Sequence, residues 1–104
     1  MAFTPYHNIN GANGVNIELI KAGDNTRGIK SILIANTKAG NVSISLFIKN
    51  LATGDSFGIC RGVGIPQGCS LLIDDKPTLS FDGNKFGLHA TVGDSDTMDI
   101  LINT

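Results

Sequence analysis

The sequence predicts an all-β protein: a single-domain β-sandwich of about eight antiparallel strands, in jelly-roll or immunoglobulin-like order. Apolar and polar residues alternate with a period of two, most clearly over Val42–Lys49, which places every second side chain on one face of a strand. Glycine, asparagine and aspartate gather between the alternating runs, as in tight turns. The runs recur roughly every 8 to 15 residues, the spacing of sandwiches and jelly rolls.

The predicted strands follow the alternating runs along the chain. Both faces of Ile29–Ala35 are apolar, so this strand should lie centrally or have its outer face covered. Residues 36–41 have turn composition, and we expect them to pair Ile29–Ala35 with Val42–Lys49 as a hairpin. The full set is Val15–Lys21, Ile29–Ala35, Val42–Lys49, Ser56–Cys60, Leu71–Ile73, Leu79–Phe81, Phe86–Val92 and Met98–Ile102.

A glycine-rich segment, Gly62–Gly68, separates the fourth and fifth predicted strands. It lacks the G-x-G-x-x-G spacing and the strand-to-helix context of a phosphate-binding loop, so we interpret it as a bent β-connection. Pro66 has no N–H to donate to a sheet, which suits a strand end. Residues 82–84 and 93–96 supply the turns between the last three strands.

The 104 residues suffice for one domain, which we divide into an irregular N-terminal arm over residues 1–14 and a sandwich over residues 15–104. Proline, asparagine and glycine punctuate the arm without any period. Two readings of the arm stay open. It frays in solution, or it becomes ordered across a neighbouring subunit and buries Phe3, Tyr6 and Ile9 there.

The composition favours association over a free monomer, although a weakly charged soluble monomer remains an alternative. Charged residues make up 16% of the chain, against roughly 25% in soluble domains, so little charge repulsion opposes contact between copies. The net charge is −1 and the eight lysines and arginines are dispersed, which does not predict nucleic-acid binding. The longest mainly apolar stretch, Ile29–Ala35, is too short to cross a membrane, and residues 1–8 do not resemble a signal peptide.

No motif predicts an enzyme, a cofactor or a metal site. The pairs Asp74-Asp75 and Asp94-x-Asp96 could suggest calcium, but no EF-hand spacing accompanies them, and turn-forming aspartates explain them better. A glycosidase needs two facing carboxylates, and the chain has one glutamate and no tryptophan platform.

The histidines and cysteines also lack a catalytic pattern. His7 falls in the arm and His89 falls on the polar face of its strand, where we expect an exposed surface histidine. Cys60 and Cys69 flank the glycine-rich segment. We expect both to be reduced, and leave a disulfide open.

Phe47 lies on the opposite face from Val42, Ile44 and Ile48 in the clearest strand. It is therefore covered by another layer or exposed for contact. We predict that Phe47 and the arm are interface sites, and that Phe47→Ser weakens assembly more than it weakens folding.

Four segments, in this order, resemble small β-sandwich virion proteins of tailed bacteriophages, especially those of cyanophages and other marine phages. They are Ile29–Thr37, which an alternating strand follows, and then Ile65–Leu71, Asp82–Asn84 and Met98–Ile102. The resemblance spans roughly residues 15–102. It implies a non-enzymatic subunit present in many copies, made in the host cytoplasm and located in the virion. Such a subunit would be a capsid cement or decoration protein, or a small neck, tail or baseplate component, that binds other virion proteins and copies of itself.

A second hypothesis is a sandwich that binds carbohydrate or a host surface. An aromatic platform would distinguish this hypothesis from a structural subunit. One tyrosine and five phenylalanines are available for it, most of them in strand register.

Overall fold

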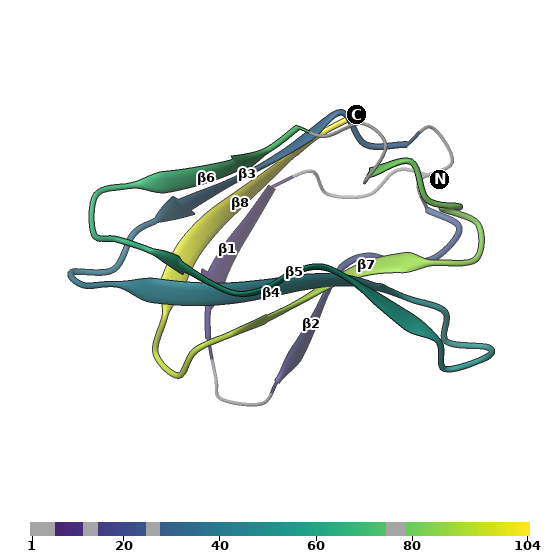
Figure 1. Cartoon of the computed structure of the whole chain (residues 1–104), viewed down its shortest axis with the longest axis horizontal. Helices are drawn as coiled ribbons and strands as arrows, with labels where there is room; N and C mark the ends of the chain where they lie inside the picture. The colour runs from purple at the N-terminus through teal and green to yellow at the C-terminus, as the bar shows by residue number, and fades with distance from the viewer. Residues whose placement is uncertain (1–5, 12–14, 25–27, 75–78) are drawn as a thin grey trace.

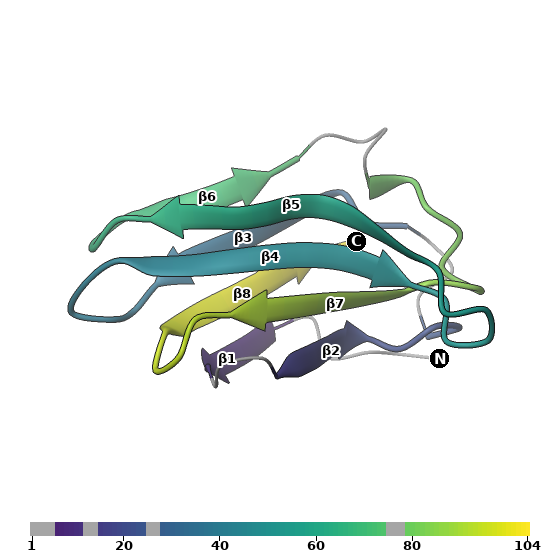
Figure 2. The same cartoon turned by 60° about the horizontal axis from the view of Figure 1, so that its bottom comes forward.

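The computed structural model describes residues 6–11, 15–24, 28–74 and 79–104, which form two four-stranded sheets (Figure 1). In spatial order, sheet A contains β1 (Tyr6–Asn10), β8 (Thr97–Asn103), β3 (Ser31–Asn36) and β6 (Ser70–Ile73). Sheet B contains β2 (Asn16–Ile20), β7 (Gly87–Val92), β4 (Val42–Lys49) and β5 (Ser56–Ile65), side by side in Figure 2. All paired strands are antiparallel, so the predicted eight-stranded β-sandwich is confirmed.

The strand order is that of a jelly roll. Strand β1 pairs with β8, β2 with β7, β3 with β6 and β4 with β5, so the first half of the chain runs antiparallel to the second half. The contacts β3–β8 and β4–β7 then join these pairs into the two sheets. An immunoglobulin-like order would keep more consecutive strands in one sheet, whereas here only β4 and β5 follow one another within a sheet.

The predicted hairpin between Ile29–Ala35 and Val42–Lys49 is wrong. Strand β3 lies in sheet A and β4 lies in sheet B, so residues 37–41 carry the chain across the sandwich. Alternation specifies which face of a strand is buried, and both strands do bury one face against the common core. It does not specify the neighbouring strand, and five residues can span the roughly 10 Å between packed sheets.

The N-terminal prediction also needs correction. Residues 6–10 are not an irregular arm but strand β1, at the edge of sheet A. His7 and Ile9 point inward while Tyr6, Asn8 and Asn10 are exposed, so an asparagine-rich composition conceals a two-residue period. Residues 1–5 and 12–14 lie outside the described part of the chain.

Two further boundaries differ from the sequence prediction. Strand β5 continues to Ile65 and includes the first half of the glycine-rich segment. Leu79–Phe81 is not a strand, although Leu79 is fully buried in the core as an apolar side chain should be. Each strand at the centre of the sandwich contributes side chains to that core: Ile32 and Ile34, Ile44 and Leu46, Leu88 and Ala90, Met98 and Ile100. No helix in the described ranges has the length and apolar character of a membrane span.

Candidate functional site

The outer face of sheet A has a row of apolar side chains, one from each strand. In register across β1, β8, β3 and β6, Tyr6 lies opposite Leu101, Leu101 opposite Leu33, and Leu33 opposite Leu72. Tyr6 is 65% exposed, Leu72 55% and Leu101 47%, and Leu33 between them is half-buried. We call these four residues the apolar row. Single exposed apolar residues are ordinary, but a contiguous row across a sheet marks a contact surface.

The neighbourhood of the apolar row is nearly uncharged. The next row on the same face consists of Asn8, Asp99, Ala35 and Ser70, and its single carboxylate, on Asp99, accepts a 2.7 Å hydrogen bond from the Asn8 amide. On the other side, Ser31 and Asn103 border a hollow of about 390 Å³ above the row. Asp74, exposed and two residues after Leu72, adds a second carboxylate at this border, so a partner docking here would have few charges to desolvate.

The outer face of sheet B has a different character. Gly58, Phe47, His89 and Glu18 lie in register across its four strands. The Phe47 ring stacks on the His89 ring, with centroids 5.6 Å apart and an interplanar angle of 17°. His89 Nδ1 lies 3.0 Å from Asn16 Oδ1, and His89 Nε2 lies 4.0 Å from Glu18 Oε2.

The expectation of an exposed His89 is wrong, because the side chain is 4% exposed. The Phe47 ring covers one side of the His89 imidazole, and strand β2 lies on the other side. Gly87, two residues earlier, makes this fit possible, since a Cβ there would press on the Ile20 carbonyl oxygen and approach His89 Nε2. Strand pattern gave the correct face, but the large neighbours on that face were not visible in the sequence.

Burial lowers the pKa of His89 below its ordinary value of 6.5. The Glu18 carboxylate raises it in part, and Lys49 on β4 lowers it further. His89 Nε2 is buried without a hydrogen-bond partner, and Asn16 occupies Nδ1. The ring is thus held neutral, stacked and oriented.

Beside Phe47, the face of sheet B has a depression of about 420 Å³. It lies between β4 and the edge strand β5, and Ser45, Phe47, Gly58 and Arg61 border it. Two shifts in the β4–β5 register, between Ile44 and Leu46 and between Leu46 and Phe47, accompany the depression. Bulges of this kind are common at sheet edges and next to binding sites.

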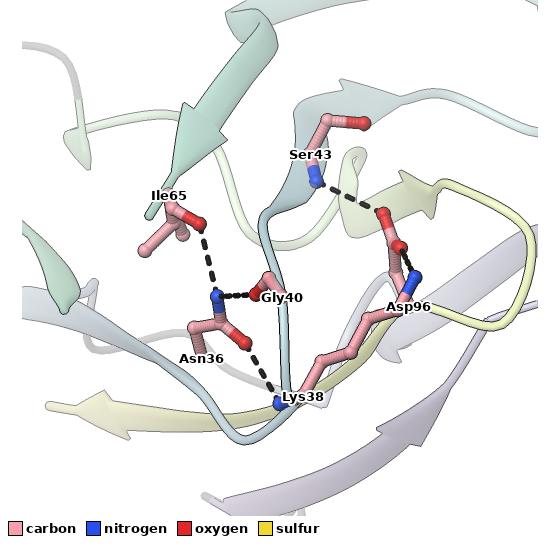
Figure 3. A network of polar contacts seen from close by, with 6 residues as sticks. All are labelled: Asn36, Lys38, Gly40, Ser43, Ile65 and Asp96. Atoms are coloured by element: carbon pink, nitrogen blue, oxygen red, sulfur yellow. Dashed lines mark hydrogen bonds and ion pairs between the residues drawn. The ribbon is translucent and has the colours of Figure 1, made fainter. Parts of the chain in front are cut away.

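A polar network at one end of the sandwich centres on Asp96 (Figure 3). The carboxylate accepts a 2.9 Å hydrogen bond from Lys38 Nζ and a 3.0 Å hydrogen bond from the Ser43 N–H. Asn36 donates to the Gly40 and Ile65 carbonyls and accepts from the Lys38 N–H. The network ties the β3–β4 connection to the β7–β8 turn, so Asp96 has a structural role.

Burial alone would raise the pKa of Asp96. The hydrogen bonds from Lys38, Ser43 and Gly93, together with the Lys38 charge, outweigh burial and hold the pKa below its ordinary value. Asp96 is therefore ionised and fully engaged by protein groups. Within the described ranges, no three or more histidine, cysteine, aspartate or glutamate side chains lie together as a metal ion would need.

Cys60 and Cys69 are both free thiols, so the question of a disulfide left open by the sequence is answered. Cys69 is exposed, and Cys60 pairs with Leu46, whose side chain faces the core. The contacts found for His89, on the outer face of the same sheet, are with Asn16, Glu18 and Phe47 rather than with either cysteine.

The three predicted contact residues that the structure describes do not form one site. Tyr6 belongs to the apolar row, Phe47 is half-buried on the other sheet, and Phe3 lies outside the described residues. Ile9 was wrong as a surface contact, since it is 6% exposed and belongs to the core. The sequence pattern did not single out the three leucines of the row, although the two apolar faces of Ile29–Ala35 were a signal for Leu33.

Comparison with protein-family models, with curated proteins and with solved structures finds no match to this chain.

Proposed function

We propose that this chain is a non-enzymatic structural subunit of a tailed-bacteriophage virion that associates, in many copies, through the apolar row of sheet A. The observation that carries this proposal is the register of Tyr6, Leu101, Leu33 and Leu72, which gives all four strands an outward apolar side chain at one level. The phage assignment itself derives from the sequence resemblance. Within the virion, a capsid cement or decoration role and a neck or tail role both fit.

The shape of the row favours contact with a second copy of the same face. Four strands at about 4.8 Å spacing make a row about 15 to 20 Å long. A two-fold axis lying in the plane between the two facing sheets, parallel to the strands, would place Tyr6 of one copy opposite Leu72 of the other, and Leu101 opposite Leu33. Few charged side chains border the row, so little like-charge repulsion opposes such a contact.

The size of the face indicates weak pairwise contact. The six residues of β3 that pair with β8 extend about 20 Å, so the whole face covers roughly 400 Å² per copy. A stable pairwise interface buries about 800 Å² per partner. A contact of half that area suits a particle, in which many copies bind together and avidity replaces individual affinity.

Sedimentation velocity at increasing protein concentration, up to about 1 mM, tests the association. Wild type should show concentration-dependent dimers, and the double variant Leu72→Thr/Leu101→Thr should stay monomeric because threonine keeps strand propensity but removes apolar area. Leu51→Thr is the matched control, since Leu51 is 59% exposed in the turn between β4 and β5. A wild type that is strictly monomeric, or a double variant that associates like wild type, would contradict the proposal.

Phe47 stays a predicted contact residue, and the same experiment tests it. If Phe47→Ser abolishes association while Leu72→Thr/Leu101→Thr does not, the interface lies on sheet B instead. Quantitative mass spectrometry of purified phage particles from cultures carrying the gene tests the virion location. Many copies per particle are expected, and the absence of the chain from particles would refute that location.

A further inference from the structure

We propose that the depression beside Phe47 on sheet B binds a carboxylated saccharide, such as a hexuronic-acid residue of an acidic glycan. This site is on the opposite sheet from the apolar row, so it goes beyond the structural role and can fail independently of it. Three features of the described residues favour this ligand: the open side of the Phe47 ring, the hydroxyl groups around it, and Arg61, which has no acidic partner among them.

The Phe47 ring has one covered side and one open side. His89 on β7 stacks against it at 5.6 Å, whereas the residue paired with Phe47 on the other neighbouring strand is Gly58. A Cβ added to Gly58 would meet no atom within 4 Å, so the space above it is open. The depression occupies this space, and a flat apolar ring at its wall can contact the C–H face of a sugar ring.

Hydroxyl groups surround the aromatic wall. Ser45, Ser56 and Thr91 line the same depression, and each hydroxyl can both donate and accept, as sugar hydroxyls do. Ser45 Oγ accepts a 2.8 Å hydrogen bond from the Gly62 N–H, which fixes its position and leaves its own proton to donate. The volume of about 420 Å³ falls in the range of small-ligand sites, roughly 300 to 1,000 Å³.

Arg61 gives the site its charge preference. Arg61 lines the depression, and among the described residues no carboxylate lies within ion-pair distance of it; the carboxylates with such a neighbour are Asp96, beside Lys38, and Glu18, beside the neutral His89. Lys49 lies two residues from Phe47 on the same face, opposite Ser56. A guanidinium binds a carboxylate through two parallel hydrogen bonds, so an acidic sugar matches the lining better than a neutral one.

An NMR titration of the whole chain with a galacturonic-acid trimer tests the proposal, with a galactose trimer as the neutral comparison. The acidic trimer should shift the amide signals of Gly58 and Arg61 to saturation, and the neutral trimer should bind at least tenfold more weakly. Equal binding of the two trimers, or no binding of the acidic one, would overturn the proposal. Inorganic phosphate that shifts the same amides at the same concentrations would also overturn it, by revealing a general anion site.

Two variants locate the site, each with a matched control. Gly58→Leu should abolish saturable binding, because an added Cβ meets no atom within 4 Å, the longer side chain would occupy the depression, and the Gly58 φ lies outside the left-handed region. Gly64→Leu, on the same strand and face opposite Ser43 and equally open, should bind like wild type. Arg61→Gln should weaken binding about tenfold, whereas Lys30→Gln should not. Wild-type binding by both Gly58→Leu and Arg61→Gln would refute the assigned site, and a urea unfolding curve for each variant verifies folding.

Discussion

Replacing Asp96 with asparagine should destabilise the sandwich, because this carboxylate links the two segments that join the sheets at this end, the β3–β4 connection and the β7–β8 turn. The carboxylate accepts hydrogen bonds from Lys38 Nζ and from the Ser43 N–H (Figure 3). The Asp96 backbone accepts a hydrogen bond from the Gly11 N–H and donates one to the Gly93 carbonyl oxygen. Asp96 is 7% exposed. A hydrogen bond to a charged group contributes about 1.5 to 3 kcal/mol, and asparagine can replace only one of the two acceptor oxygens.

The expected loss for Asp96→Asn is therefore about 2 kcal/mol of unfolding free energy at neutral pH. For a chain of this length, that loss lowers Tm by roughly 10 °C and the urea midpoint by roughly 1 M. Urea unfolding followed by far-ultraviolet circular dichroism measures it. Asp94→Asn is the control in the same turn, where the side chain is exposed, and should change stability by less than about 0.5 kcal/mol.

The pH dependence gives a second, independent check. The pKa of Asp96 is lowered in the folded protein, so the folded state holds fewer protons than the unfolded chain at acidic pH. The stabilisation is complete above the ordinary pKa of 3.8 and is lost as the pH falls through the lower folded value. The difference between wild type and Asp96→Asn should shrink over that range. A difference below about 0.5 kcal/mol at pH 7, or one that stays constant down to pH 2, would refute the role given to Asp96.

Three further predictions concern other parts of the fold. In an NMR titration, His89 should have a midpoint below 6.5, and a midpoint above 6.5 would contradict the burial of His89 as a neutral ring. The free energy of unfolding should fall as the pH drops below 6.5, because the unfolded chain takes up the proton before the folded protein does. His89→Gln should remove this pH dependence in urea unfolding, and an unchanged dependence would assign it to another group. Gly11→Ala should lower the free energy of unfolding by about 1 to 3 kcal/mol, because a Cβ would overlap the Val92 side chain and the Gly93 carbonyl oxygen. Gly40→Ala is the control, since a Cβ there meets open space and should leave the urea unfolding curve nearly unchanged. Equal effects of the two variants would exclude close packing at Gly11.

Local patterns in the sequence predicted much of the fold. Val42–Lys49 has the predicted bounds, because a two-residue period with polar residues on one face occurs only when one side of a strand is buried. The same logic located β2, β3, β6, β7 and β8 within two residues at each end. It failed for β1, where Asn8 and Asn10 resemble turn residues although they are the exposed positions of an edge strand.

Features that depend on contacts between distant strands could not be predicted. The apolar row needs Tyr6, Leu33, Leu72 and Leu101 at one level, and only the register of four strands from the whole length of the chain brings them there. His89 shows the same limit. Its position on the outer face was predictable, whereas its burial depends on Phe47, which lies 42 residues away in the sequence and beside it in the sheet.

The most direct test of association through sheet A is an intermolecular nuclear Overhauser experiment on a mixture of isotope-labelled and unlabelled copies. We expect cross-peaks between the Tyr6 ring of one copy and the Leu72 methyl groups of another, at concentrations where sedimentation detects dimers. Cross-peaks from residues of sheet B, with none from the apolar row, would contradict it.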